Sequence, residues 1–428
     1  MGIESEASSQ VAAGRFGRVL IIHPEGNTSA NPSLTALIGA LLGSGVSVDL
    51  RCGTSRAASV KLANVRTVPY GRWLRVVKQL IIDQLCAWGA VLPLAVLEWA
   101  SYYRGYDLIV GVDRAGVIEA AALGALTRTP YVMMSFEMMF EVETSKRFKR
   151  LERRACRGAA AWIVQDEIRA AQLERENELP SDRKILLPLA SGGVGVPSEE
   201  RIRDCLSIPR DKHVAAMIGS LTYWSLAPEV IASTASWPED WVLLVHERYG
   251  QALDLLGRDP EYHKAVESGR VYVSLTPTET VDEMGCVLAG VSAGIALYHP
   301  DPRSAYTGLN LQHLGMASGK IATYLRYGIP VVMNEIGLYA AEARMHGFGV
   351  VVDGPKDIGA VLRELSDPRW RAVALRYFTQ RLDFELYREG LLEALDNCVI
   401  DSHPVHTTHN APARASVTPL TRDRQGTG

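Results

Sequence analysis

The sequence has few cysteines, and none of them stands in a paired arrangement. Its six cysteines are scattered over 428 residues, at positions 52, 86, 156, 205, 286 and 398. This spacing predicts neither a zinc knuckle nor a disulfide framework. Scattered free thiols are typical of a protein that stays in the reducing cytoplasm.

Long apolar runs and a strong excess of one charge are also absent from the sequence. No apolar run reaches the roughly 20 residues that a transmembrane helix needs, and the polar, acidic residues 1–14 do not resemble a signal peptide. The net charge of −3 gives no general attraction to the phosphates of nucleic acids. We therefore expect a cytoplasmic protein without a nucleic-acid partner.

What the chain does contain is a regular alternation of short apolar runs with helical patterns. Strands that alternate with helices pair in parallel and form a doubly wound sheet. We predict a Rossmann-like α/β domain over residues 15–190. Its apolar runs are 18–22, 46–50, 107–112, 130–134, 161–164 and 184–187.

The same alternation starts again after a glycine-rich stretch at 191–197. Because 428 residues exceed what one hydrophobic core usually supports, we predict a second Rossmann-like domain over residues 191–375. A helix at about 376–396 is expected to pack back on the first domain, and residues 400–428 are expected to be disordered. Ligands of such sheets bind at the carboxyl ends of the strands, so the cleft between the domains is the expected site. The second set of runs is 213–218, 241–245, 270–273, 293–298, 330–333 and 349–352.

The segment Ser318-Gly319-Lys320 has the chemistry of a diphosphate site. Ser318 is a favourable helix N-cap, and Gly319 allows a ligand to approach the backbone closely. The first turn of the helix leaves N–H groups unpaired at the positive end of the helix dipole, and Lys320 adds a full charge there. The alternative is a capped surface helix with a solvated lysine.

Residues 294–298 and 315–332 resemble the donor-binding segment of family-four-like bacterial glycosyltransferases with the GT-B fold. The likeness rests on the loop at 318–320 and on the turn Gly328-Ile-Pro-Val-Val332. It implies two Rossmann-like, doubly wound parallel-sheet domains that face a cleft, with residues 15–190 as the acceptor domain and residues 191–375 as the sugar-nucleotide donor domain. The implied reaction is transfer of a sugar from a nucleoside diphosphate to a hydroxyl acceptor, with no cofactor and no metal. The donor-binding residues that it implies are Gly219, Ser220, Tyr298, Asn310, Gly315, Met316, Ala317, Ser318, Gly319, Lys320 and Thr323.

Two positions depart from the pattern of that family. Its retaining members carry two Glu residues eight positions apart, and the corresponding positions here are Gly315 and Thr323. The loop 219–225 also lacks the Arg and Lys that many members have there, so Lys320 is the main cation expected at the phosphates, with Arg303 as a second candidate. These departures leave two alternatives open, a pseudoenzyme that binds a nucleotide or a partner and a sugar-nucleotide epimerase of the same fold.

Two acidic residues follow apolar runs of the first domain. Asp113 comes after the run 107–112 and Glu137 after the run 130–134, so both are expected at the cleft. A carboxylate there can orient or deprotonate the acceptor hydroxyl. We therefore take Asp113, Glu137 and Lys320 as the candidate catalytic residues. Alternatively, each carboxylate caps a helix or pairs with a nearby Arg.

The loop after the first run is a candidate acceptor or phosphate loop. Its residues Gly26, Asn27 and Asn31 follow a strand that should end at the cleft. Asn31 is also the expected cap of a helix that has Pro32 at its first position. As plain turn and capping residues the three would look the same.

Residues 72–103 carry more apolar surface than a helix flanking a sheet needs. The simplest interpretation is a pair of helices that face the core. The alternative is an interfacial element that meets an anionic membrane carrying a lipid-linked acceptor. That alternative places the protein at the inner face of the plasma membrane, in the assembly of surface polysaccharide or glycolipid. The apolar residues at helical spacing are Trp73, Val76, Val77, Leu80, Ile81, Leu85 and Trp88, and the basic ones elsewhere are Arg72, Arg75 and Lys78.

Overall fold

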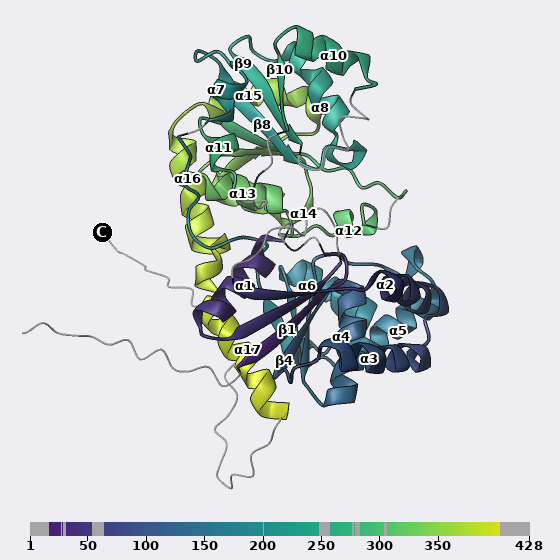
Figure 1. Ribbon diagram of the computed structural model, residues 1–428. Coiled ribbons are helices and arrows are strands. Elements are labelled where there is room, and N and C mark those ends of the chain that lie inside the picture. Colours follow the sequence, from purple (N-terminus) through teal and green to yellow (C-terminus); the bar gives the residue numbers. More distant parts are fainter. Residues whose placement is uncertain are drawn as a thin grey trace, which may run out of the picture.

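The computed structural model describes residues 17–26, 28, 31–53, 64–199, 201–247, 257–275, 278, 283–303 and 306–402. These residues form two parallel sheets, and each sheet lies in its own half of the molecule (Figure 1). Helices flank both sheets. The predicted fold class, two doubly wound α/β halves, is therefore confirmed.

The first sheet has seven parallel strands: β1 (Arg18–His23), β2 (Ser47–Cys52), β3 (Val65–Pro69), β4 (Leu108–Val112), β5 (Tyr131–Met134), β6 (Ala161–Val164) and β7 (Lys184–Leu186). Their order in the sheet is β3-β2-β1-β4-β5-β6-β7. The order therefore reverses between β1 and β4, which is the topological switch point where such sheets bind ligands. Strand β3 was not predicted, because Arg66 and Thr67 interrupt its apolar pattern at the edge of the sheet.

Helices cover both faces of the first sheet, which makes this half a three-layer structure. Side chains alternate between the two faces along each strand. Leu20 and Ile22 of β1 pack into a core with helices of one face, and Val19 and Ile21 pack into a second core on the other. The helices of this half are α1 (Pro32–Gly43), α2 (Arg72–Gln79), the π-helical η3 (Leu80–Leu85), α3 (Trp88–Tyr102), α4 (Asp113–Thr127), α5 (Lys146–Arg157) and α6 (Glu167–Asn177), with short turns η4 (Glu141–Glu143) and η5 (Ser181–Arg183).

The second sheet has six parallel strands: β8 (His213–Gly219), β9 (Trp241–Glu247), β10 (Val271–Ser274), β11 (Ala293–Ala296), β12 (Val331–Met333) and β13 (Gly349–Val351). Their order is β10-β9-β8-β11-β12-β13. All six coincide with apolar runs predicted from the sequence. The four central strands β9, β8, β11 and β12 are buried on both faces, and such strands consist of near-continuous apolar residues. The helices around this sheet are α7 (Ile202–Cys205), η6 (Tyr223–Ser225), α8 (Ala227–Ser233), η7 (Thr234–Ser236), α10 (Pro260–Glu267), α11 (Gly285–Leu288), α12 (Leu309–Gln312), α13 (Gly319–Arg326), α14 (Gly337–His346), η8 (Pro355–Asp357), α15 (Ile358–Leu365) and α16 (Arg369–Tyr377).

The last elements of the chain return from the second half to the first. They are η9 (Phe378–Leu382), η10 (Phe384–Leu386) and α17 (Arg388–Ser402), and Figure 1 shows α16 and α17 running along one side of both halves. Leu391 and Leu395 of α17 share a core with residues of α1 and β1. Where the chain crosses, the backbone N–H of Gly193 donates to Asp383 at 2.9 Å. The rest of the predicted tail, 403–428, lies outside the described residues.

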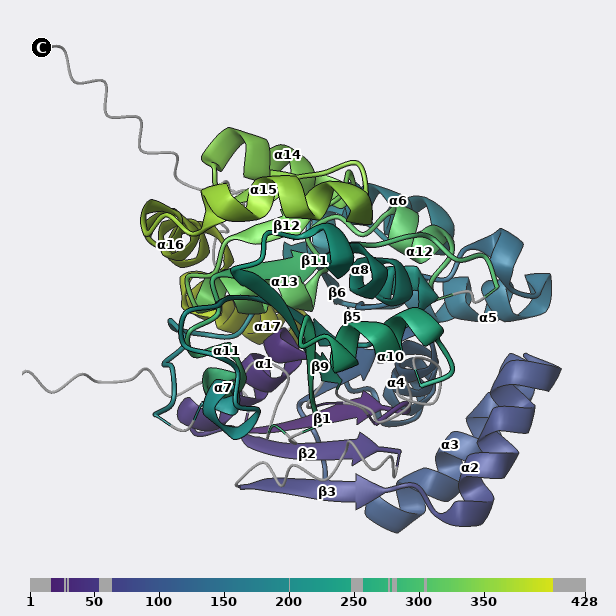
Figure 2. The same ribbon diagram turned by 90° about the horizontal axis from the view of Figure 1, so that it is seen from above.

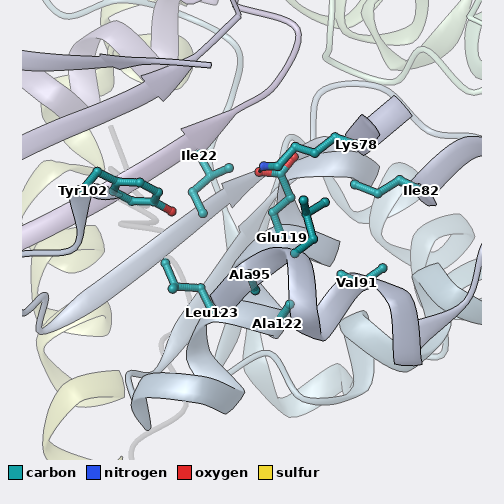
Figure 3. A pocket seen from close by; sticks show the side chains of 10 residues that line it. Ile22, Lys78, Ile82, Val91, Ala95, Tyr102, Glu119, Ala122 and Leu123 are labelled. Atoms are coloured by element: carbon teal, nitrogen blue, oxygen red, sulfur yellow. Dashed lines mark hydrogen bonds and ion pairs between the residues drawn. The ribbon is translucent and has the colours of Figure 1, made fainter. Parts of the chain in front are cut away.

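Helices α2 and α3 lie side by side at the edge of the first half (Figures 1 and 2). Their inner side packs against the core through Ile82 and Val91, but Trp73 and Leu97 are 83% and 68% exposed. The interpretation that this whole segment faces the core is therefore wrong for its outer side. Lys78 is also not on the surface: it is buried, and it pairs with Glu119 of α4, beside which it lies in Figure 3.

Candidate functional site

Asp113 lies at the carboxyl end of β4 with its backbone in the left-handed region, at φ +54°. This conformation is uncommon for residues other than glycine, and hydrogen bonds of the side chain hold Asp113 in place. Its Oδ1 accepts hydrogen bonds from the backbone N–H groups of Phe136 (2.6 Å) and Glu137 (2.9 Å). Burial, and then the nearby carboxylate of Glu25, raise the pKa of Asp113 well above its usual value. Asp113 therefore anchors the loop that follows β5.

Glu137 is carried by that loop and lies half-buried. Burial raises the pKa of Glu137 to about 7, and the guanidinium of Arg169 acts in the opposite direction. One carboxylate oxygen of Glu137 accepts a hydrogen bond from the side-chain amide of Asn310. A pKa raised toward neutral pH is what a carboxylate acting as a general base needs.

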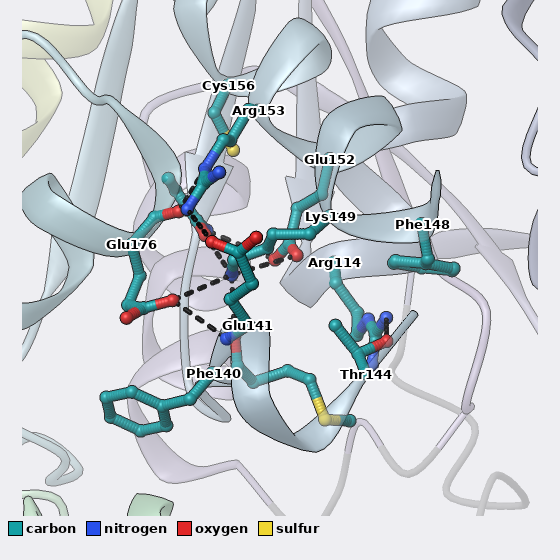
Figure 4. A network of polar contacts seen from close by, with 12 residues as sticks. Arg114, Phe140, Glu141, Thr144, Phe148, Lys149, Glu152, Arg153, Cys156 and Glu176 are labelled. Atoms are coloured by element: carbon teal, nitrogen blue, oxygen red, sulfur yellow. Dashed lines mark hydrogen bonds and ion pairs between the residues drawn. The ribbon is translucent and has the colours of Figure 1, made fainter. Parts of the chain in front are cut away.

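A buried lysine also holds the loop that carries Glu137. Lys149 of α5 is 1% exposed and donates to the carbonyl oxygen of Met139 at 2.6 Å. It also pairs with Glu152 at 3.2 Å, and Figure 4 shows Lys149 at the centre of this network. The position of Glu137 is therefore set by two buried side chains, Asp113 and Lys149.

Two further residues of the first half, which the sequence did not single out, reach the second half. Asp166 follows β6; its Oδ1 caps α6 through the N–H groups of Ile168 and Arg169, and its Oδ2 accepts the N–H of Met316 at 2.6 Å. Arg169 is fully buried and donates to the carbonyl oxygen of His313 at 3.1 Å. The signal for Asp166 was available, because it stands after a strand in the same way as Asp113 and Glu137 do.

Asn310 of α12 lies against the first half. Its side-chain oxygen accepts the backbone N–H of Met138 at 3.0 Å and lies 3.4 Å from a nitrogen of Arg169. Its amide nitrogen donates to Glu137. The prediction placed Asn310 at the donor, but the described contacts make it a link between the two halves at the candidate base.

Gly315 lies where the two halves touch. A Cβ on this residue would meet Oδ2 of Asp166 at 2.1 Å, and its φ is +55°. No side chain can occupy this position beside Asp166. A Glu at this position, which the resemblance would suggest, therefore has no room beside the carboxylate of Asp166.

Ser318 and Lys320 begin helix α13. The Oγ of Ser318, which is 2% exposed, accepts the N–H of Ile321 at 3.2 Å and shares a hydrogen bond with the hydroxyl of Tyr298. The Nζ of half-buried Lys320 donates to the carbonyl oxygen of Ser220 at 3.1 Å. Burial lowers the pKa of Lys320 to about 7.

The loop after β8 forms the wall against which Lys320 packs. Gly219 has a φ of +91°, and a Cβ there would lie 3.1 Å from Cε of Lys320. The Nζ of Lys320 lies 4.8 Å from the ring centre of Trp224, which stacks on Tyr298 with 5.8 Å between centroids. Trp224 was not predicted, because a phosphate site suggests charged residues in this loop and not an aromatic ring.

The remaining candidates of the donor segment have simpler surroundings. Ala317 donates its N–H to Leu314 at 2.9 Å, and Gly319 meets only ordinary contact distances. Thr323 is buried, at 4% exposure. Arg303 pairs with Asp301 at 2.7 Å on an exposed loop and lies over the ring of Tyr223, so the structure gives it a partner other than phosphate.

The candidate acceptor loop is described only in part. Asn27 lies outside the described residues. Gly26 has a φ of +76°, and a Cβ there would lie 2.4 Å from the carbonyl oxygen of Gly53. Asn31 stands before α1, but its side chain forms no cap and lies 3.2 Å from Nε2 of His23. Asn31 thus occupies the predicted N-cap position before Pro32, but the predicted capping by its side chain is wrong.

The described residues contain neither a metal cluster nor a membrane-spanning helix. Among those residues, no group of three or more His, Cys, Asp or Glu is arranged to hold a metal ion. In the same part of the chain, no helix has the length and apolar character to cross a membrane.

The fold is shared with several solved structures, although no protein-family model and no curated protein matches the sequence. HepE from Anabaena in complex with UDP is 14% identical, with a TM-score of 0.65 over 89% of this chain and 100% of that chain. Sucrose-phosphate synthase from Thermosynechococcus elongatus is 16% identical, with a TM-score of 0.64 over 90% of this chain and 100% of that chain. WaaG, a glycosyltransferase involved in lipopolysaccharide biosynthesis, is 13% identical, with a TM-score of 0.57 over 88% of this chain and 99% of that chain. Identities this low establish a shared architecture and leave the activity to be argued from the site: the chain has the GT-B fold of these glycosyltransferases.

Proposed function

We propose that this protein is a glycosyltransferase that moves a sugar from a nucleoside diphosphate to a hydroxyl acceptor. The observation that carries this proposal is the way the two halves meet. Glu137 and Asp166, at strand ends of the first half, bind Asn310 and Met316 of the second. The segment they hold leads within a few residues into Ser318 and Lys320.

The donor is proposed to lie with its diphosphate at the first turn of α13. Since Ser318 caps Ile321, the N–H groups of Gly319 and Lys320 have no partner within the helix. Together with the charge of Lys320 they can stabilise the negative charge that develops on the leaving diphosphate. The proposed chemistry uses no metal and no cofactor.

The acceptor hydroxyl is proposed to be deprotonated by Glu137. Its pKa of about 7 suits this role, and it lies at a strand end of the first half. Asp113 is given a different role, because its Oδ1 is occupied by two backbone N–H groups. We assign Asp113 to the positioning of the loop that carries Glu137.

The experiment that tests the function is a panel of UDP-, GDP-, ADP- and dTDP-sugars, scored by thermal shift and by release of the nucleoside diphosphate. HepE has been solved with UDP and with UDP-glucose, so UDP-glucose is the first probe. A thermal shift that the Lys320→Ala variant lacks, together with nucleotide release, supports a transferase. Binding without any release identifies a pseudoenzyme, and a changed sugar identifies an epimerase. If no sugar nucleotide binds, the proposed function is wrong.

The acceptor is proposed to be carried by an anionic membrane, at the inner face of the plasma membrane, as in the assembly of a surface polysaccharide or glycolipid. The outer side of α2, η3 and α3 exposes eight large apolar side chains: Trp73, Val76, Val77, Leu80, Leu85, Val96, Leu97 and Trp99. Helix α5 packs against η3, and the guanidinium of Arg154 lies 5.0 Å from the ring centre of Trp88. Beside this apolar surface α5 exposes Lys146, Arg147, Arg150 and Arg154.

In this proposal the exposed basic residues of α5 contact the anionic membrane. Lys78 does not, because it is paired with Glu119. Each exposed Lys or Arg near an anionic surface contributes about 1 kcal/mol. Co-sedimentation with anionic liposomes at low salt should fall when Arg150 and Arg154 become Gln, and also for Leu97→Ser. The matched control changes the exposed Arg363 and Arg376 of the second half to Gln and should sediment like the wild type. Wild-type protein that stays in the supernatant would refute the membrane proposal and leave the transferase proposal intact.

A further inference from the structure

Asn310 of the second half bonds directly to the proposed base in the first half. Its side chain is 4% exposed, and its amide nitrogen donates to Oε2 of Glu137. Among the described residues, this is the one hydrogen bond that the Glu137 carboxylate receives. The bond therefore leaves the other oxygen, Oε1, to take a proton from an acceptor hydroxyl.

The orientation of the Asn310 amide is determined by four neighbours. Its Oδ1 accepts the backbone N–H of Met138 at 3.0 Å and lies 3.4 Å from a guanidinium nitrogen of Arg169. Its Nδ2 faces two oxygens, the carboxylate of Glu137 and, at 3.1 Å, the carbonyl of Tyr306. A turned amide would place oxygen against oxygen and nitrogen against nitrogen. The group that points at Glu137 is therefore a hydrogen-bond donor.

Helix α12, which carries Asn310, is itself held against the first half. The N–H of Leu309 donates to Glu143 at 2.9 Å, and the carbonyl oxygen of His313 accepts from Arg169 at 3.1 Å. The amide is thus fixed by contacts on both sides of it in the chain. These contacts join the two halves, so they exist only while the halves touch.

The described charged groups around Glu137 belong to the first half. Glu25, after β1, and Asp113, at the start of α4, are carboxylates that disfavour a further negative charge beside them. Arg169 of α6 favours that charge, but its guanidinium donates to backbone carbonyl oxygens. A hydrogen bond donated to a carboxylate favours its ionised form. Of the described residues, Asn310 alone supplies such a bond to Glu137, and it does so from the other half.

We propose that Asn310 is a positioning residue for the proposed base: while the two halves touch, its amide holds the Glu137 carboxylate ionised and leaves Oε1 to the acceptor. The acceptor proton then goes to Oε1 as the acceptor oxygen bonds to the sugar carbon and the nucleoside diphosphate leaves. When the halves separate, the amide is withdrawn, and the neighbouring carboxylates favour protonated Glu137. This inference rests on the proposed function. In agreement with the geometry, burial raises the pKa of Glu137 to about 7, and the bond from Asn310 acts against that rise.

The experiment uses Asn310→Asp, which keeps the oxygen that contacts Met138 and Arg169 but turns a second carboxylate oxygen toward Glu137. The pH at which kcat/KM rises should move up by at least about one unit, because a like charge favours the protonated carboxyl. On the acidic side of the rise, kcat/KM then falls about tenfold at a given pH. Gln312→Glu is the matched control, since it adds the same charge at an exposed position of α12 and should leave the profile unchanged. Equal shifts in both variants, or no shift in Asn310→Asp, would overturn the inference.

Nucleotide binding separates this positioning role from the donor contact that the resemblance implied for Asn310. Calorimetric titration with UDP, ADP and GDP should give the same affinities for Asn310→Asp and the wild type, because the proposed diphosphate site lies at α13. A loss of affinity in the variant would show that Asn310 contacts the donor and that the inference is wrong. If none of the three nucleotides binds the wild type, the proposed function fails, and this inference fails with it.

A measurement without substrate covers the case in which Asn310→Asp does not fold or turn over. The protein is labelled with ¹³C at its glutamate carboxyl groups, and the Glu137 signal is assigned by its loss in Glu137→Gln. Its titration midpoint should rise by at least about one unit in Asn310→Asp. It should also rise in Asn310→Ala, which removes the donor without adding a charge. An unchanged midpoint in whichever variant folds would overturn the inference.

Discussion

Replacing Gly315 by Ala should be far more costly than an ordinary glycine substitution. Gly315 has a φ of +55°, and its Cβ would lie 2.1 Å from Oδ2 and 2.7 Å from Cγ of Asp166. That carboxylate cannot simply turn away, because its other oxygen caps α6. The side chain of Asp166 must therefore lose its bond to the N–H of Met316, or the two halves must move apart.

The magnitude follows from two contributions. A non-glycine residue in the left-handed region costs roughly 1–2 kcal/mol. A lost hydrogen bond to a charged group costs roughly 1.5–3 kcal/mol. The free energy of unfolding should thus fall by roughly 2.5–5 kcal/mol in Gly315→Ala, if the two contributions add.

Gly347 offers a control for the first contribution alone. It ends α14 with a φ of +68°, and no atom lies within 4 Å of the place where its Cβ would stand. Gly347→Ala should therefore lose only roughly 1–2 kcal/mol. In an Asp166→Ala background, Gly315→Ala should cost the same small amount, because the space is then free.

The assay is urea unfolding followed by tryptophan fluorescence, for the wild type, the two single variants Gly315→Ala and Asp166→Ala, and the double variant. The cycle should give a coupling energy of roughly 1.5–3 kcal/mol between the two positions. Additive effects, with the full loss retained in the double variant, would show that Asp166 does not occupy this space. Steric exclusion by Asp166 would then fail to explain the missing family Glu.

Three further predictions concern the chemistry. Glu137→Gln should lower turnover by ~10²–10⁴ and abolish the rise in kcat/KM as pH increases through about 7; a pH profile that keeps this rise would exclude Glu137 as the base. Lys320→Ala should lower turnover by ~10²–10³ but stabilise the free protein at pH 6 in thermal unfolding. The wild-type pKa of Lys320 is about 7, below its unfolded value, so the cost of its charge is fully present below pH 7 and fades as pH rises toward 10.5; a destabilised variant at pH 6 would contradict this. Activity should persist in excess chelator, and a loss that Mg²⁺ or Mn²⁺ restores would show that the mechanism is wrong.

The sequence predicted the strands better than it predicted which faces of the helices meet the core. Strands such as β8 and β9 are buried on both faces, so their apolar runs are unmistakable. The edge strand β3 was not predicted, because only its residue Val68 is buried. The outer side of α2 and α3 was also undecided, because helical spacing alone does not say which face of an amphipathic segment meets the core.

The candidate site was predicted in part, and its gaps have physical causes. Residues at strand ends, such as Asp113 and Glu137, follow from topology alone. Their different roles do not follow from topology. The two backbone N–H groups that donate to Asp113 belong to a loop that lies 23 and 24 residues further along the chain. The position of Asn310 against the first half likewise could not be predicted, because it depends on contacts between residues more than 170 positions apart.

The contact between Gly315 and Asp166 changes what the missing Glu means. A family position without its carboxylate suggests a lost function when the sequence is considered by itself. In the structure Oδ2 of Asp166, from the first half, lies 2.1 Å from the place where a Cβ on Gly315 would stand and accepts the N–H of Met316 at 2.6 Å. This carboxylate lies beside Gly315 only while the two halves touch. Substituting Asp166 is therefore more informative about activity than restoring a Glu at Gly315, which the two halves leave no room to hold.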